Sequence, residues 1–246
     1  MIRGFAIAAV LSIAAPAWAA APCPNPWMPL VRGATWTYRA ANGERITLRV
    51  SDADAKPGFV IATMDTMAPL AAGETAESGL DPVLQTTFLC TADGMSLPFG
   101  EAVNAGRLHI ETLREEGVTL PSPEKLIPGA QWSSARTLRI SSGDRVARTR
   151  IASAHQAAAL EKIETPAGTF EAMRIDVALD ISSVVDAPRP APSASGLLPT
   201  KGVAHLWFAK GVGLVKMTSD VPPIPGANTP VPAPSLELMQ SSGTKR

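Results

Sequence analysis

The chain has 246 residues, with 22 Lys and Arg against 22 Asp and Glu, so its formal net charge at pH 7 is zero. This balance excludes a global electrostatic field that would attract nucleic acid or an anionic membrane surface. The length is enough for one large β domain or two small ones.

Residues 1–19 have the three-part layout of a secretory signal peptide. Arg3 precedes the apolar run Phe5–Ile13, and Ala17-Trp18-Ala19 offers small residues for cleavage after Ala19. The segment is too short for a permanent membrane helix, and no later apolar run reaches the roughly 18 residues that such a helix needs. We therefore expect an exported protein of the periplasm or extracellular space that is not an integral membrane protein.

Both cysteines, Cys23 and Cys90, lie after the predicted cleavage site. In an oxidising compartment an isolated pair most simply forms a disulfide bond. The alternative is a lipid attached to Cys23, which the preceding Ala21-Pro22 disfavours. We predict one bridge between Cys23 and Cys90.

Alternation of apolar and polar residues recurs along the chain and is clearest at Met173–Ile181, which predicts a half-buried strand. Shorter strands are expected at Thr35–Ala40, Ile46–Val50, Phe59–Met64, Gln85–Thr91, Arg107–Thr112, Arg136–Ser141, Val146–Ile151, Leu160–Glu164, Val203–Phe208, Gly213–Thr218 and Leu236–Gln240. Glycine-containing turns separate many of them and favour antiparallel neighbours. Only Ala68–Leu80 and Ala154–Ala159 are candidate helices.

Two proline-rich segments, residues 186–200 and 220–234, interrupt this pattern. Proline cannot donate to a β ladder, so both are expected to be loops. They could be domain linkers, but strand patterns resume after each and neither remainder could bury its own core. The sequence therefore predicts a single all-β domain over residues 20–246, a curved antiparallel sheet forming an open barrel or a sandwich.

Two stretches of the chain resemble each other. Pro29–Trp36 and Lys125–Trp132 both run from an apolar pair into Gly-Ala-x-Trp, and a strand follows each. The glycine allows a tight bend at the entry to the sheet, and the tryptophan can fill the core beside it. We expect the sheet to contain two similar hairpin units.

Five phrases in order resemble a set of uncharacterised exported bacterial proteins. The phrases are P-L-x-x-G-x-x-W-x-Y at Pro29–Tyr38, G-x-x-W at Gly129–Trp132, P-A-G-T-F at Pro166–Phe170, W-F-A-x-G-V-G-L-V-K at Trp207–Lys216, and L-E-L at Leu236–Leu238. Lys210 stands where the resemblance leads one to expect proline. The resemblance implies an exported, mainly antiparallel β domain and implies no activity.

No motif in the chain predicts catalysis, a metal or a cofactor. His109, His155 and His205 lack the spacing of a metal site, and there is no Gly-x-Ser-x-Gly elbow. Gly211-Val212-Gly213 lacks the third glycine and the helix of a phosphate-binding loop. We therefore expect no catalytic, metal-binding or cofactor-binding residues.

Arginines gather in one predicted hairpin. Arg136, Arg139, Arg148 and Arg150 could bind an anionic partner, such as a phosphorylated lipid head group or an acidic glycan. The alternative is a solvated strand face whose charges discourage edge pairing.

The expected function is that of a non-enzymatic periplasmic or envelope binding or assembly module. Its curved sheet could cup a lipid or another apolar small molecule. The alternatives are a module that binds an envelope protein through its proline-rich loops, and a hydrolase without a recognisable motif.

Overall fold

The computed structural model describes residues 23, 25–67, 82–96, 102–105, 108–143, 145–186, 200–220 and 235–242. The predicted signal peptide, the candidate helix Ala68–Leu80 and nearly all of both proline-rich segments lie outside these residues. The ends of the first segment, Asp186 and Thr200, belong to strands.

The described residues form fourteen strands and no helix. The strands are β1 (Thr35–Ala40), β2 (Arg45–Lys56), β3 (Phe59–Met67), β4 (Pro82–Thr91), β5 (Gly94–Ser96), β6 (Ala102–Ala105), β7 (Leu108–Gly117), β8 (Leu120–Pro121), β9 (Gln131–Ser142), β10 (Arg145–Thr165), β11 (Gly168–Asp186), β12 (Thr200–Ala209), β13 (Gly213–Ser219) and β14 (Ser235–Ser242).

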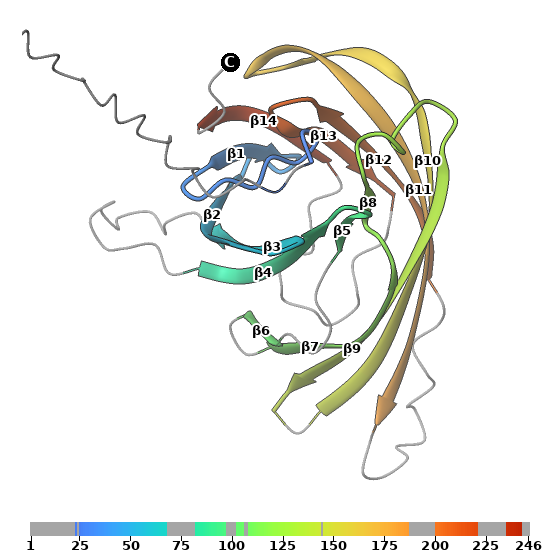
Figure 1. Cartoon of the computed structure of the whole chain (residues 1–246). Coiled ribbons are helices and arrows are strands. Elements are labelled where there is room, and N and C mark those ends of the chain that lie inside the picture. Colours follow the sequence, from blue (N-terminus) through green and yellow to red (C-terminus); the bar gives the residue numbers. More distant parts are fainter. Residues whose placement is uncertain are drawn as a thin grey trace, which may run out of the picture.

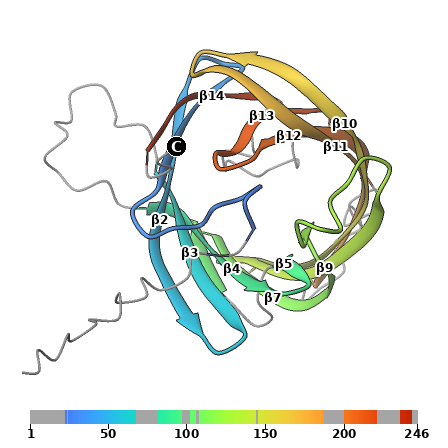
Figure 2. The same cartoon turned by 45° about the horizontal axis from the view of Figure 1, so that its top comes forward.

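All fourteen strands belong to one sheet in the order β6-β7-β9-β10-β11-β12-β13-β14-β1-β2-β3-β4-β5-β8. Every pairing in it is antiparallel. The sheet coils into a ring of strands (Figures 1 and 2). The all-β prediction is therefore confirmed, in its open-barrel form rather than as a sandwich.

The candidate helix Ala154–Ala159 is wrong, because these residues lie in the middle of β10. Pairing with β9 and β11 on both sides outweighs the weak helical preference of an alanine-rich stretch. Val146–Ile151 and Leu160–Glu164, expected as two strands, are two parts of this one strand. The register shifts between Ala157 and Leu160, so a bulge hides the continuity from the sequence pattern.

One half of the barrel is filled by the chain itself. The segment 25–33 and the turn between β12 and β13 lie inside the ring of strands (Figure 2), and the Gly211 amide of that turn donates to the Pro26 carbonyl. Trp36 donates a hydrogen bond from Nε1 to the Val212 carbonyl at 2.5 Å, and the Tyr38 hydroxyl donates to the Leu214 carbonyl at 2.8 Å. Both aromatic side chains are about 1% exposed. We call this part, centred on Trp36, the filled half.

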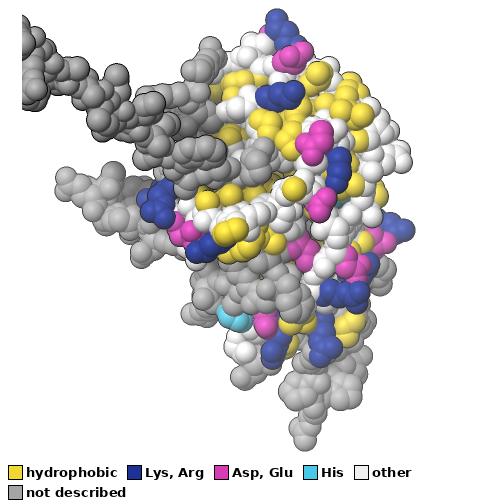
Figure 3. All heavy atoms as spheres, in the orientation of Figure 1, with side chains coloured by type: hydrophobic (Ala, Val, Ile, Leu, Met, Phe, Trp, Pro, Cys, Tyr) yellow, Lys and Arg dark blue, Asp and Glu magenta, His cyan; other side chains and the backbone are white. Residues whose placement is uncertain are grey.

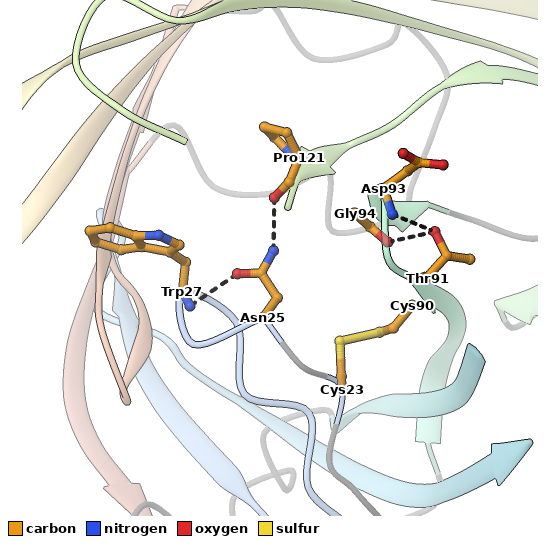
Figure 4. The surroundings of a disulfide bond; sticks show 8 residues. All are labelled: Cys23, Asn25, Trp27, Cys90, Thr91, Asp93, Gly94 and Pro121. Carbon is orange, nitrogen blue, oxygen red and sulfur yellow. Dashed lines mark hydrogen bonds between the residues drawn. A yellow bond between two sulfur atoms is a disulfide. The ribbon is translucent and has the colours of Figure 1, made fainter. Parts of the chain in front are cut away.

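A disulfide bond joins Cys23 to Cys90 of β4, as expected, with the two Cα atoms 5.6 Å apart. Beside it, the Asn25 side chain donates to the Pro121 carbonyl and accepts from the Trp27 amide (Figure 4). Asn25 is buried, so these two bonds satisfy a polar group that would be costly to leave unpaired. The N-terminal segment is thus fixed to the sheet covalently and by hydrogen bonds.

The two similar stretches of sequence form the same turn. Gly33 and Gly129 have φ angles of 84° and 87°. The Gly33 amide donates to the Val50 carbonyl, and the Gly129 amide donates to the Ala157 carbonyl. We call the hairpins that follow, β1–β2 and β9–β10, the first and second units.

Candidate functional site

The inner face of β7, β9, β10 and β11 carries a group of branched apolar side chains. Alternation from the buried residues Ala157 and Ile175 assigns the inward positions, and the strand register aligns them across the sheet. The apolar members of this face are Ile110, Leu138, Ile140, Ile151, Leu179 and Ile181. We call these six residues the apolar inner face.

The apolar inner face is only half buried. Of its six side chains, only Leu179 packs against the buried core of the described residues. In the first unit the corresponding region is closed, because Leu30 of the 25–33 segment and Trp36 of β1 are fully buried and Trp36 contacts the β12–β13 turn. The second unit therefore leaves apolar surface that the described chain does not bury.

Trp132 and His155 lie between the filled half and the apolar inner face. Their rings stack with centroids 5.0 Å apart, and Ser134 Oγ is 3.1 Å from His155 Nε2. Burial lowers the pKa of His155 from 6.5 to about 4, so the ring is neutral at pH 7.

The two tryptophans at equivalent positions differ in their hydrogen bonding. Trp36 Nε1 donates to Val212, whereas Trp132 Nε1 is buried and has no acceptor among the described residues. The β12–β13 turn supplies the acceptor in the filled half, and no described segment supplies one in the second unit.

Arg136 lies on the inner face, directly opposite Ile151 of β10 and Glu115 of β7. Burial lowers the pKa of its guanidinium, and the Glu115 carboxylate opposes that shift. A charged pair therefore adjoins the apolar inner face, with Ser134 and Leu138 two residues away on the same strand face. Alternation places Arg136 on the same face of β9 as Trp132, which the sequence predicts to fill the core. The sequence pattern could therefore have separated Arg136 from the other three arginines.

The four arginines expected to form one anionic-partner patch do not share a face. Arg139, Arg148 and Arg150 lie on the outer face, where Arg139 is directly opposite Arg148. The Oε2 atom of Glu111 is 3.9 Å from Nη1 of Arg139. Acidic and basic side chains are interspersed on the outer surface in Figure 3. The structure brings three of these arginines together and places Arg136 on the opposite face of the sheet.

A second polar cluster spans the outer faces of β10, β11 and β12. Glu161 accepts hydrogen bonds from Arg174 at 2.6 Å and from Trp207 Nε1 at 2.9 Å. His205 Nδ1 is 2.6 Å from Asp176 Oδ1. All of these side chains are part of one cross-strand network, whose contacts stabilise the sheet surface.

Neither histidine cluster forms a catalytic triad in the described part of the chain. The Ser134–His155 pair has no carboxylate hydrogen-bonded to the imidazole, and the His205–Asp176 pair has no hydroxyl hydrogen-bonded to it. Within the described ranges, no group of three His, Cys, Asp or Glu side chains is placed to hold a metal ion.

Comparison of the structure with solved structures identifies its fold. An exported protein with a YmcC-like fold from Bacteroides fragilis matches with a TM-score of 0.52 and 18% identity, over 88% of this chain and 98% of that chain. This chain therefore has the YmcC-like fold.

Two further structures show weaker similarity. A lipoprotein from Parabacteroides distasonis has a TM-score of 0.44 and 12% identity, over 87% of this chain and 97% of that chain. The hypothetical lipoprotein YmcC from Escherichia coli has a TM-score of 0.38 and 9% identity, over 77% and 80%. No protein-family model and no curated protein matches the sequence.

The described residues hold no helix of the length and apolar character needed to cross a membrane.

Proposed function

We propose that this protein is an exported, non-enzymatic binding module that holds an apolar ligand against the apolar inner face. The observation that carries the proposal is the contrast between the two units of the barrel. The first unit is filled by Trp36, Leu30 and the β12–β13 turn. The second presents six half-buried apolar side chains on the inner face of β7, β9, β10 and β11.

Three further observations support this role. The first 19 residues have the pattern of a secretory signal, and the similar structure from Bacteroides fragilis is described as an exported protein. A concave apolar face with a few polar groups is the usual form of a small-molecule site. Ser134, on the inner face of β9, provides such a polar group beside it.

The hydrolase alternative is less well supported. His155 is next to Ser134, but its lowered pKa makes the neutral ring a weak base and no carboxylate orients it among the described residues. The alternative of protein binding through the proline-rich loops concerns residues outside those described.

The proposal is tested with two substitutions on opposite faces of β11. Ile181→Gln places a polar side chain on the apolar inner face, whereas Val184→Gln changes an outer position that is 63% exposed. The purified protein, cleaved after Ala19, is titrated with the fluorescent methyl ester of cis-parinaric acid and analysed by native mass spectrometry. We expect saturable binding that Ile181→Gln weakens at least tenfold and Val184→Gln leaves within twofold.

Absence of saturable binding to the wild-type protein, together with native masses that show no bound small molecule, would contradict the proposal. Equal weakening by the two substitutions would also contradict it, because the site would then not lie on the inner face.

A further inference from the structure

The inner face of the second unit combines apolar and charged groups in adjacent rows. Glu115, Arg136, Ile151 and Ile181 follow one another across β7, β9, β10 and β11. The next row holds Leu138, between Thr112 and Thr149. A guanidinium is unfavourable on a surface that serves only core packing, because removing an ion from water is costly.

Arg136 has more hydrogen-bonding capacity than its neighbours use. A guanidinium carries five N–H donors in a planar fork, and a carboxylate such as Glu115 engages two of them at most in a bidentate pair. Glu115 is the cross-strand neighbour of Arg136, and its carboxylate interacts electrostatically with the guanidinium. Donors therefore remain for a second anionic group.

The position of Arg136 matches the chemistry of an amphiphile. Its direct neighbour Ile151 and the next residue on its own strand face, Leu138, both belong to the apolar inner face. Successive residues on one face of a strand are about 7 Å apart, so a head group at Arg136 places its chain directly on these side chains.

We propose that Arg136 binds the head group of the ligand, and that the ligand is therefore an anionic amphiphile: an acyl chain that ends in a carboxylate or a phosphate. This inference rests on the proposed function, since it names the class of ligand that the apolar inner face holds. Glu115 competes with the head group for the guanidinium and limits its affinity.

The experiment compares an anionic probe with its neutral counterpart. The protein cleaved after Ala19 is titrated at pH 8 with cis-parinaric acid and with cis-parinaric acid methyl ester. We expect the acid to bind at least tenfold more tightly than the ester. Arg136→Gln should abolish this preference while ester binding stays within twofold, because only the charge-assisted contact is lost.

Arg150→Gln is the matched control. It removes the same charge from the neighbouring strand, and Arg150 lies on the outer face opposite Thr137. The preference for the acid should persist in this variant. If it disappears, the effect comes from net charge rather than from Arg136, and the inference is overturned.

Glu115→Gln separates a binding role for Arg136 from a structural one. Removal of the competing carboxylate should tighten binding of the acid at least threefold and leave the ester unchanged. A purely structural ion pair predicts weaker binding of both probes in this variant. Arg136→Lys, which keeps the charge, should retain part of the preference if Arg136→Gln fails to fold.

Displacement distinguishes the two head groups. Lysophosphatidic acid and an unlabelled fatty acid of equal chain length compete for bound cis-parinaric acid, with the monoacylglycerol as the neutral comparison. Equal binding of acid and ester to the wild-type protein would overturn the inference and leave the proposed function standing. Binding of neither probe would overturn both.

Discussion

At the scale of one residue, the burial of Tyr38 can be tested directly, because it is the single tyrosine of the chain. Burial raises its pKa far above the ordinary value of 10.0, and its hydroxyl donates to Leu214. An unfolded tyrosine ionises near pH 10, so above that pH the unfolded state loses a proton that the folded state keeps. The free energy of unfolding should therefore fall as the pH rises beyond about 10.

Absorbance of the tyrosinate measures this directly. Its appearance should coincide with loss of near-ultraviolet circular dichroism rather than precede it. Tyr38→Phe should remove this tyrosine's contribution to the alkaline loss of stability, and it should cost about 1 kcal/mol at pH 7, because the Leu214 carbonyl loses its donor. Tyrosinate absorbance in a protein that is still folded would contradict the prediction.

Burial of His155 gives the free energy of unfolding the opposite dependence on pH, at acidic values. Its pKa is about 4 in the folded protein, against 6.5 for an ordinary histidine. Between these two values the unfolded state binds a proton that the folded state excludes, so the free energy of unfolding falls as the pH drops from 6.5 to about 4.

Urea denaturation at several pH values tests this. His155→Phe keeps an aromatic ring against Trp132 and should flatten the dependence in this window, at the cost of the contact with Ser134. Equal slopes for His155→Phe and the wild type would refute the assignment.

At the scale of elements, the disulfide fixes the segment that fills one half of the barrel. Cys23 and Cys90 are 67 residues apart, and a loop of this size stabilises the folded state by about 4 kcal/mol in the chain-entropy model. The double variant Cys23→Ser and Cys90→Ser should lose about this much in urea denaturation. Two titratable thiols in the folded, unreduced wild type would contradict the bridge.

The two equivalent turns give a matched pair of substitutions. Gly33 and Gly129 both have positive φ angles, and a Cβ atom at either position would meet nothing within 4 Å. Gly33→Ala and Gly129→Ala should therefore cost only backbone strain, about 1–2 kcal/mol each, and the two costs should be similar. Thermal unfolding measures both. A much larger cost at one site would show that the turns are not equivalent.

At the scale of the whole molecule, one continuous sheet connects every described strand. β1 near the N-terminus pairs with β14 at the other end of the described chain, and β10 and β11 extend along much of the barrel (Figure 1). Neither half can keep its edge strands paired without the other. We expect one cooperative unfolding transition, with coincident far- and near-ultraviolet circular dichroism curves. Two separate transitions would argue for two domains.

The sequence determined the local features of this protein. Side-chain alternation in stretches such as Met173–Ile181 specified strands, because the period of two follows from the geometry of a single strand. The two cysteines indicated their bridge, and Gly33 and Gly129 marked two equal turns, because positive φ angles favour glycine at such positions.

Only the tertiary structure decided which face of each strand is the inner one. Alternation separates two faces of β9, but the curvature of the sheet and its distant partners place Arg136 inside and Arg139 outside. The tertiary structure also decided which half of the barrel is filled. Trp36 donates a hydrogen bond to Val212 of the β12–β13 turn, whereas Trp132 stacks on His155. Trp36 and Val212 are 176 residues apart, so their contact depends on packing of the complete sheet, which no local pattern records.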